Sequence, residues 1–144
     1  MFSELSSRND IELMVAFPYE GRNRSNYMDI DLPYSHINLD VATKTFPIVG
    51  DTFQFVNLFD VLSKYNPDII IAEGNPRITT LYKLLNPSRV NNYKTIAWTK
   101  FDNSTGSIKR KVWNNFLSKW DSIVCYGEIS QKNIIDMKCN DANN

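Results

Sequence analysis

Three short segments of the chain carry the side chains best suited to contact a ligand. Each places a charged or amide group beside a residue that lets the backbone approach a small molecule. The segments hold Glu73, Gly74, Asn75 and Arg77, then Thr99, Lys100 and Asp102, and last Gly127 and Glu128. They are the candidate binding residues, and the pattern singles out no catalytic residue among them.

Several of these residues also have an ordinary structural explanation. Gly74 and Gly127 suit tight strand-to-helix turns, and that role is favoured for both. Glu73 and Arg77 either form a local ion pair at a helix start or contact a ligand, and both interpretations stay open. The phosphate-binding patterns GxGxxG and GxxxxGK[ST] are missing, so no nucleotide cofactor is predicted.

Other reactive side chains form no recognisable catalytic or metal-binding set. His36 is the single histidine and has no second metal ligand nearby, so it is interpreted as structural or exposed. Asp29 and Asp31 are separated by one residue, a spacing too common to indicate metal or glycosidase chemistry. Cys125 and Cys139 fit neither a disulfide framework nor a metal site and are predicted to be free thiols. The N-terminus lacks the layout of a secretory signal. Together with the free thiols, this predicts a cytoplasmic protein.

The candidate segments are positioned by an alternation of strand and helix patterns. Apolar and β-branched runs predict strands over residues 11–17, 36–41, 68–72, 94–98 and 123–126. Helical spacing predicts helices over residues 53–65 (capped by Asp51 and Thr52), 77–85, 108–120 and 128–137. Right-handed crossovers then give an α/β fold, a parallel Rossmann-like sheet with helices on both faces. Ligands of such sheets bind at the carboxyl ends of the strands, where the three segments begin.

The predicted helix over residues 108–120 has two interpretations. Its apolar stripe, which includes Val112, Trp113, Phe116 and Trp120, is typical of a helix that packs on a sheet, with lysines outside. Three consecutive basic residues beside two tryptophans also resemble a surface for an anionic membrane or a partner. The packing interpretation is favoured because a helix that covers a sheet must bury such a stripe.

Composition limits the size and the partners of the molecule. The chain has 144 residues, of which 42% are hydrophobic and 22% charged, as expected for a single globular domain over residues 1–144. Sixteen Lys and Arg balance sixteen Asp and Glu. This zero net charge argues against a dedicated nucleic-acid-binding protein. No run approaches the roughly 20 apolar residues of a membrane span.

From residue 66 onwards, the chain resembles the N-terminal Rossmann-like half of GT-B glycosyltransferases, in particular the family 4 (group 1) class. The similar stretches are PDIIIAEGNPR at residues 67–77, TIAW at residues 95–98 and KWDSIVCYGE at residues 119–128. They follow one another in the order and spacing of that class. The resemblance implies a Rossmann-like domain that binds the acceptor, with the three candidate segments facing the cleft.

In that class a second domain binds the nucleotide-sugar donor, and the sugar passes to a saccharide or lipid-linked acceptor between the two domains. The first strand with its Gly-rich turn and the donor half are missing from this sequence. The resemblance therefore implies a partial domain that is inactive alone, because transfer requires both substrates in reacting geometry. The alternative is a non-enzymatic α/β interaction module that binds a protein partner or makes peripheral contact with a membrane surface.

Overall fold

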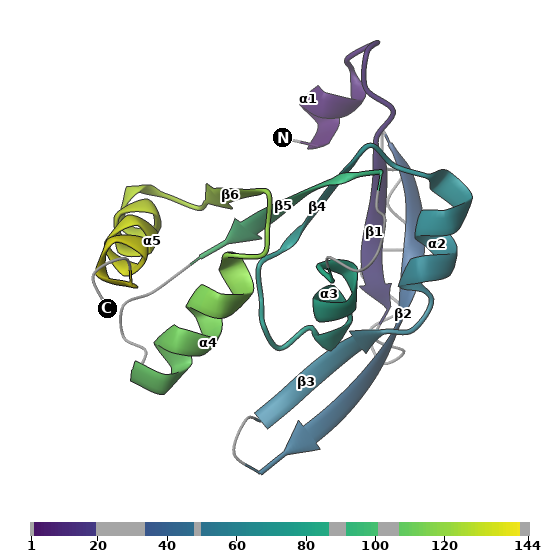
Figure 1. The fold of residues 1–144 in the computed structure, drawn as a ribbon. Helices are drawn as coiled ribbons and strands as arrows, with labels where there is room; N and C mark the ends of the chain where they lie inside the picture. Colours follow the sequence, from purple (N-terminus) through teal and green to yellow (C-terminus); the bar gives the residue numbers. More distant parts are fainter. Residues whose placement is uncertain (1, 20–33, 48–49, 87–91, 101–106, 142–144) are drawn as a thin grey trace. The chain divides into compact units, whose positions relative to one another are not determined.

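The structure is a computed structural model that describes the whole chain except residues 1, 20–33, 48–49, 87–91, 101–106 and 142–144. The chain forms two compact units, Met1–Val61 and Leu62–Asn144. Each unit holds a three-stranded sheet (Figure 1). The single domain expected over residues 1–144 stays a prediction.

The first unit contains a short helix, a mixed sheet and the start of a helix that continues into the second unit. Its elements are α1 (Phe2–Ser6), β1 (Met14–Tyr19), β2 (Ser35–Phe46) and β3 (Gly50–Phe55). β1 runs parallel to β2, and β2 forms an antiparallel pair with β3. The chain enters β3 at Gly50, whose φ of 77° lies in the left-handed region that glycine adopts readily. The antiparallel pair was not predicted from the sequence.

The first predicted strand is shifted along the chain. Predicted over residues 11–17, it forms over Met14–Tyr19, so it begins three residues later and continues past Phe17. Pro18 lies inside β1 opposite Leu39 of β2. Among the described strands, β1 pairs only with β2. A proline is tolerated in such a strand because its missing N–H can lie on the unpaired side.

The helix predicted over residues 53–65 is wrong in its first turn. Residues 53–55 belong to β3, and α2 (Leu58–Tyr65) begins only after Asn57. The side-chain oxygen of Asn57 accepts the backbone N–H of Asp40 in β2 at 3.0 Å, which fixes the start of α2 beside the sheet. Strand pairing therefore overrides the helical spacing of this segment.

The predicted cap of that helix is also part of the hairpin. Asp51 and Thr52 lie in β3, opposite Thr45 and Lys44 of β2. The Thr52 hydroxyl donates a hydrogen bond to the carbonyl of Lys44 at 3.1 Å. These side chains therefore join two strands and cap no helix.

The second unit confirms the predicted α/β alternation. Its three strands are β4 (Ile69–Glu73), β5 (Lys94–Thr99) and β6 (Ser122–Cys125), and both neighbouring pairs are parallel. The helices that follow them are α3 (Thr79–Leu84), α4 (Ser107–Leu117) and α5 (Glu128–Asp141). Each strand therefore leads into a helix at the same edge of the sheet.

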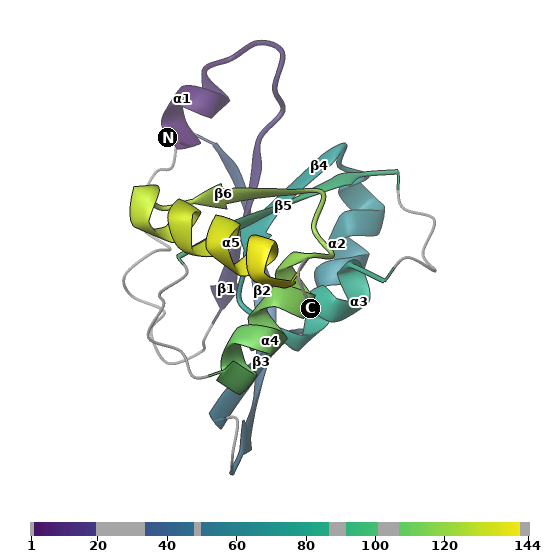
Figure 2. The ribbon, with the colours of Figure 1, turned by 60° about the vertical axis from the view of Figure 1, so that its left-hand side comes forward.

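One face of this sheet forms the core of the second unit. On β5, Thr95, Ala97 and Thr99 are all buried. Figures 1 and 2 show α3 and α4 on the same side of the sheet, and these helices supply the fully buried side chains of Leu81, Leu84, Phe116 and Leu117. The Phe116 ring contacts Tyr82 of α3, with ring centroids 4.9 Å apart.

The opposite face of the sheet carries apolar side chains that the described residues leave exposed. It carries Ile69 and Ile71 of β4 and Val124 of β6, each at least 50% exposed. The described residues therefore cover one face of the sheet, and the predicted cover on both faces is not seen in them.

The helix α4 only partly follows the predicted stripe. Phe116 is fully buried, Trp120, just beyond the helix, is 6% exposed, and Trp113 is half-buried, so the packing interpretation holds for this part. Val112 was expected in the same stripe but is 47% exposed, and Ile108 is 79% exposed. The buried face is instead centred closer to Leu117, which packs over Gly74. The lysines expected outside are exposed, namely Lys109, Lys111 and Lys119.

No helix in the described part of the chain combines the length and the apolar character needed to cross a bilayer.

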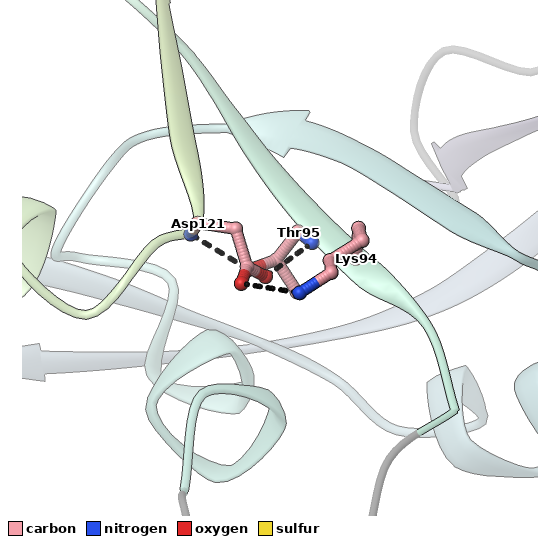
Figure 3. A network of polar contacts seen from close by, with 3 residues as sticks. All are labelled: Lys94, Thr95 and Asp121. Atoms are coloured by element: carbon pink, nitrogen blue, oxygen red, sulfur yellow. Dashed lines mark hydrogen bonds and ion pairs between the residues drawn. The ribbon is translucent and has the colours of Figure 1, made fainter.

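A polar network fixes the amino end of the sheet (Figure 3). The Asp121 carboxylate accepts the backbone N–H of Thr95 at 2.8 Å and its hydroxyl at 2.9 Å. Lys94 contacts the same carboxylate at 3.4 Å. These hydrogen bonds hold the pKa of Asp121 below its usual value. The network joins β5 to the turn that precedes β6, at the end of the sheet opposite the candidate segments.

Candidate functional site

The three candidate segments follow the carboxyl ends of β4, β5 and β6, which meet at one edge of the second sheet. An open groove of about 470 Å³ lies at this edge. We call it the α5 groove. It is lined by Lys100, Tyr126, Gly127, Glu128, Ile129 and Ser130. The structure thus brings together Lys100, Gly127 and Glu128 from the predicted set.

The segment after β4 forms a turn organised by Asn75. Its side-chain N–H donates to the Glu73 carboxylate at 3.2 Å, and its side-chain oxygen accepts the backbone N–H of Arg77 at 3.0 Å. Glu73 and Arg77 are both exposed. Within the described residues no ion pair joins them, and neither lines the α5 groove. A ligand contact by these two side chains stays a prediction.

Gly74 and Thr99 form a close packing contact between β4 and β5. A Cβ atom added to Gly74 would lie 2.9 Å from the Thr99 Cβ, 3.1 Å from the Ala97 Cβ and 3.3 Å from a methyl carbon of Leu117. The Thr99 hydroxyl, which is buried, donates to the carbonyl of Gly74 at 3.2 Å. The geometry therefore gives both residues a packing role, and neither lines the α5 groove.

The segment after β6 begins α5 and forms the floor of the groove. Gly127 lies just before the helix, and its carbonyl accepts the N–H of Gln131 at 3.1 Å. Apart from its chain neighbours, no atom of the described residues lies within 4 Å of the position that a Gly127 Cβ would occupy. Glu128 is exposed at the first helical position, and Lys100 is exposed just after β5. The predicted site residue Asp102 lies outside the described residues.

Two aromatic residues at this edge were not among the predicted site residues. The rings of Trp98 and Tyr126 stack with centroids 4.9 Å apart and an interplanar angle of 13°. Tyr126 is 59% exposed and borders the groove. The strand register explains the stack, because Trp98 lies opposite Val124 and Tyr126 follows two residues later on the same face. The sequence alone does not give this register.

The lining of the α5 groove is mainly apolar, with a few charged and polar groups at its border. Lys100 supplies a donor, Glu128 an acceptor, and Tyr126 an apolar wall. Cys125, a free thiol at the end of β6, is partly buried, and burial raises its pKa, so the unreactive protonated form is favoured. The described residues contain no group of three or more His, Cys, Asp and Glu placed to hold a metal ion.

The remaining predicted features lie in or near the first unit. His36 is exposed on β2 and makes an edge contact with Phe17, with ring centroids 6.3 Å apart. Asp29 and Asp31 lie outside the described residues. A second opening, of about 480 Å³, holds Glu12 and Tyr34 but none of the predicted site residues. The second unit therefore carries the stronger candidate site.

Comparisons with known proteins give no relative from which residue roles could be transferred. No family model matches the chain, and neither a curated protein nor a solved structure matches it. The glycosyltransferase resemblance therefore stays a prediction, and the roles of the groove residues rest on their geometry.

Proposed function

We propose that the α5 groove binds a saccharide and that the second unit is the acceptor-binding part of a Rossmann-like domain of the GT-B glycosyltransferase type. The observation that carries this proposal is the stacked Trp98–Tyr126 pair beside the groove. The acceptor would be a free or lipid-linked saccharide. In the GT-B architecture a second domain binds the nucleotide-sugar, so the proposal assigns only acceptor binding to these residues.

The aromatic pair suits the apolar face of a sugar ring. Trp98 stacks on one face of Tyr126, while the tyrosine remains 59% exposed. A sugar ring presents a row of C–H groups, which pack on the electron-rich face of an aromatic ring in the same way as other apolar groups. Because Trp98 restrains the tyrosine ring, little conformational entropy is lost when a sugar docks on it.

The charged residues of the groove suit sugar hydroxyls. Glu128 can accept and Lys100 can donate a hydrogen bond, and both side chains are exposed at the same opening. Hydrogen bonds to charged groups contribute about 1.5–3 kcal/mol each, less where water competes. Together with one stacking contact, they support binding near the millimolar range, or about −4 kcal/mol.

The proposal is tested by saturation-transfer NMR on the full chain with a panel of mono- and disaccharides. We expect transfer to ring protons of at least one saccharide and loss of the signal in Tyr126→Ala. Tyr65→Ala is the matched control, because Tyr65 is also exposed but lies at the end of α2. A panel without any signal, or equal signals for the two variants, contradicts saccharide binding.

The open face of the second sheet favours another candidate function, a module that binds an apolar protein surface. Ile69, Ile71 and Val124 are all exposed there. A pull-down from cell extract with the wild-type chain and with Ile71→Lys tests this candidate. Loss of one specific partner in the variant, with saccharide signals unchanged, supports it, whereas identical captures contradict it.

A further inference from the structure

The charges of the chain are unevenly distributed along the sequence. The stretch from residue 74 to residue 120 contains nine of the sixteen Lys and Arg residues but only one of the sixteen Asp and Glu residues, Asp102. Nine against one gives this stretch a net charge of +8, and seven against fifteen gives the remainder −8. The zero net charge of the whole chain conceals this segregation. A stretch so rich in one sign of charge favours a surface that attracts an anionic partner.

The basic residues gather on the helix layer of the second unit. α3 and α4 contain no Asp or Glu, and both helices lie on the same side of the sheet (Figures 1 and 2). Their exposed cationic side chains are Lys83 of α3, Lys109 and Lys111 of α4, and Lys119 just beyond α4. Lys119 joins the two helices, since its ammonium nitrogen lies 6.0 Å from the centre of the Tyr82 ring. Within the described residues, no carboxylate forms an ion pair with these four lysines.

Two apolar side chains project from the same helix. Ile108 is 79% exposed and Val112 is 47% exposed. They are four residues apart, so they lie on the same side of α4. Leu117 follows Ile108 by nine residues, which places it on the opposite side of the helix, and it is fully buried in the core. We call the exposed side of this helix the α4 surface, and its residues are Ile108, Lys109, Lys111, Val112 and Lys119.

The single sign of charge and the exposed apolar groups together narrow the class of partner. Nucleic acids offer phosphates to lysines but no apolar layer to Ile108 and Val112. An anionic bilayer offers both, because acyl chains lie just beneath its phosphate headgroups. The two openings described above include no residue of α4. A bilayer can meet such a helix exterior without the shape complementarity that a protein interface requires.

We propose that the second unit binds an anionic phospholipid bilayer through the α4 surface, with the lysines at the headgroups and Ile108 and Val112 among the first acyl carbons. The contact is peripheral. It does not use the tryptophans beside the basic run, since Trp120 is buried and Trp113 is half-buried. The inference is independent of saccharide binding, which the α5 groove would perform with other residues.

The test is co-sedimentation of the full chain with two kinds of vesicle, one of phosphatidylcholine alone and one of equal parts of phosphatidylcholine and phosphatidylglycerol. We expect binding to the anionic vesicles to be at least about tenfold tighter. It should weaken when the salt concentration rises from about 0.1 M to about 1 M, because the Debye length falls from about 10 Å to about 3 Å. Equal binding to both vesicles, or binding to neither, overturns the proposal.

Charge variants test the position of the contact. The double variant Lys109→Gln, Lys111→Gln should bind the anionic vesicles about tenfold more weakly. The matched control is Lys44→Gln, Lys64→Gln, which removes the same charge from exposed lysines of β2 and α2. This control should stay within about twofold of wild type. An equal loss in the two double variants would show attraction by total charge alone and would overturn the α4 surface.

Apolar variants test insertion into the bilayer. The double variant Ile108→Ser, Val112→Ser should weaken binding to the anionic vesicles about tenfold. The matched control is Ile69→Ser, Val124→Ser, since these exposed residues lie on the face of the sheet opposite the helix layer. All four positions are exposed, and circular dichroism checks that both variants fold. A loss confined to the control would place the membrane contact on that face and overturn the α4 surface.

A short DNA duplex distinguishes a bilayer from a nucleic acid. The wild-type chain should bind the duplex more weakly than the anionic vesicles, and Ile108→Ser, Val112→Ser should leave binding to the duplex unchanged. If the duplex binds as tightly as the vesicles and the apolar variant weakens neither, the lysines recognise phosphates alone and the bilayer proposal is overturned. The saccharide signals of the α5 groove test the proposed function separately.

Discussion

Gly74 shows at the scale of a single residue why a glycine beside a candidate site can be structural. Any side chain at this position meets the Cβ atoms of Thr99 and Ala97, which are fixed to the backbone of β5 and cannot rotate away. At Gly127, also a predicted site residue, an added Cβ would meet no described atom beyond the chain neighbours within 4 Å. The two glycines have the same sequence context, a strand-to-helix turn, and different structural roles.

Gly74→Ala should therefore lower the free energy of unfolding by about 1–3 kcal/mol through overpacking. Gly127→Ala, the matched control, should cost less than about 1 kcal/mol, mainly through the weaker capping of α5 by alanine. Urea denaturation followed by circular dichroism measures both values. Equal losses in the two variants would show that β4 and β5 are further apart than the structure indicates.

Asp121 makes the stability of the second unit depend on pH. The pKa of its carboxyl is lowered, mainly by the backbone N–H of Thr95, relative to about 3.9 in an unfolded chain. The carboxylate therefore stabilises the fold at every pH above the unfolded value. This contribution decreases as the pH falls through the lower, folded pKa, because the proton must then bind in both states.

Asp121→Asn should cost about 1 kcal/mol at neutral pH, since the carboxylate is partly exposed and water competes for it. The difference from wild type should shrink on acidification below about pH 4, where the wild-type carboxyl group also becomes neutral. Urea denaturation across this pH range measures the effect. Lys94→Gln, which removes only the exposed ion-pair partner, should cost less than about 0.5 kcal/mol. If the difference in unfolding free energy between wild type and Asp121→Asn did not change with pH, the ionisation of Asp121 would not contribute to stability.

At the scale of elements, α4 packs through a narrower face than its sequence suggests. Phe116 and Leu117 are fully buried, whereas Val112 and Ile108 are exposed. The spacing of apolar residues shows that one face is buried, but the exact rotation depends on where Gly74 leaves room for Leu117. That contact joins residues far apart in sequence and cannot be read from helical spacing.

Phe116→Ala should cost about 3–5 kcal/mol, because it removes a fully buried ring that contacts Tyr82 and Trp120. Val112→Ala should change stability by less than about 0.5 kcal/mol, as expected for an exposed position. Thermal unfolding of both variants checks the rotation of the helix. A large loss of stability in Val112→Ala would show that Val112 is buried, as the wider apolar stripe of the sequence predicts.

The sequence predicts elements well where local pattern and long-range pairing agree. The β-branched run of β4 and the helical spacing of α3 lead to correct assignments, and Asn66, in the left-handed region at φ 43°, ends α2 as expected. Residues 53–55 fit a helix pattern equally well but pair with β2. Such pairing depends on a partner strand that local spacing does not specify.

The sequence also predicts only part of the candidate site. Lys100 and Glu128 follow from the rule that ligands bind at the carboxyl ends of parallel strands. Trp98 and Tyr126 do not, because their stacking depends on the register between β5 and β6.

At the scale of the whole molecule, the open face of the second sheet has a measurable consequence. Ile69, Ile71 and Val124 form an exposed apolar surface that should bind the dye ANS in the native state. The triple variant Ile69→Lys, Ile71→Lys, Val124→Lys should lose most of the dye fluorescence without unfolding. Ile108→Lys, on exposed α4, should keep it. Strong fluorescence that survives the triple substitution would place the dye elsewhere.

The Trp98–Tyr126 stack also gives the molecule an optical signature. Two nearly parallel rings with centroids 4.9 Å apart should contribute to the near-ultraviolet circular dichroism of the native chain. Trp120 is enclosed in the core and should respond little to a ligand, whereas the stack borders the open groove. The protein therefore carries its own spectroscopic reporter at the candidate site, one that can follow occupancy without an attached label.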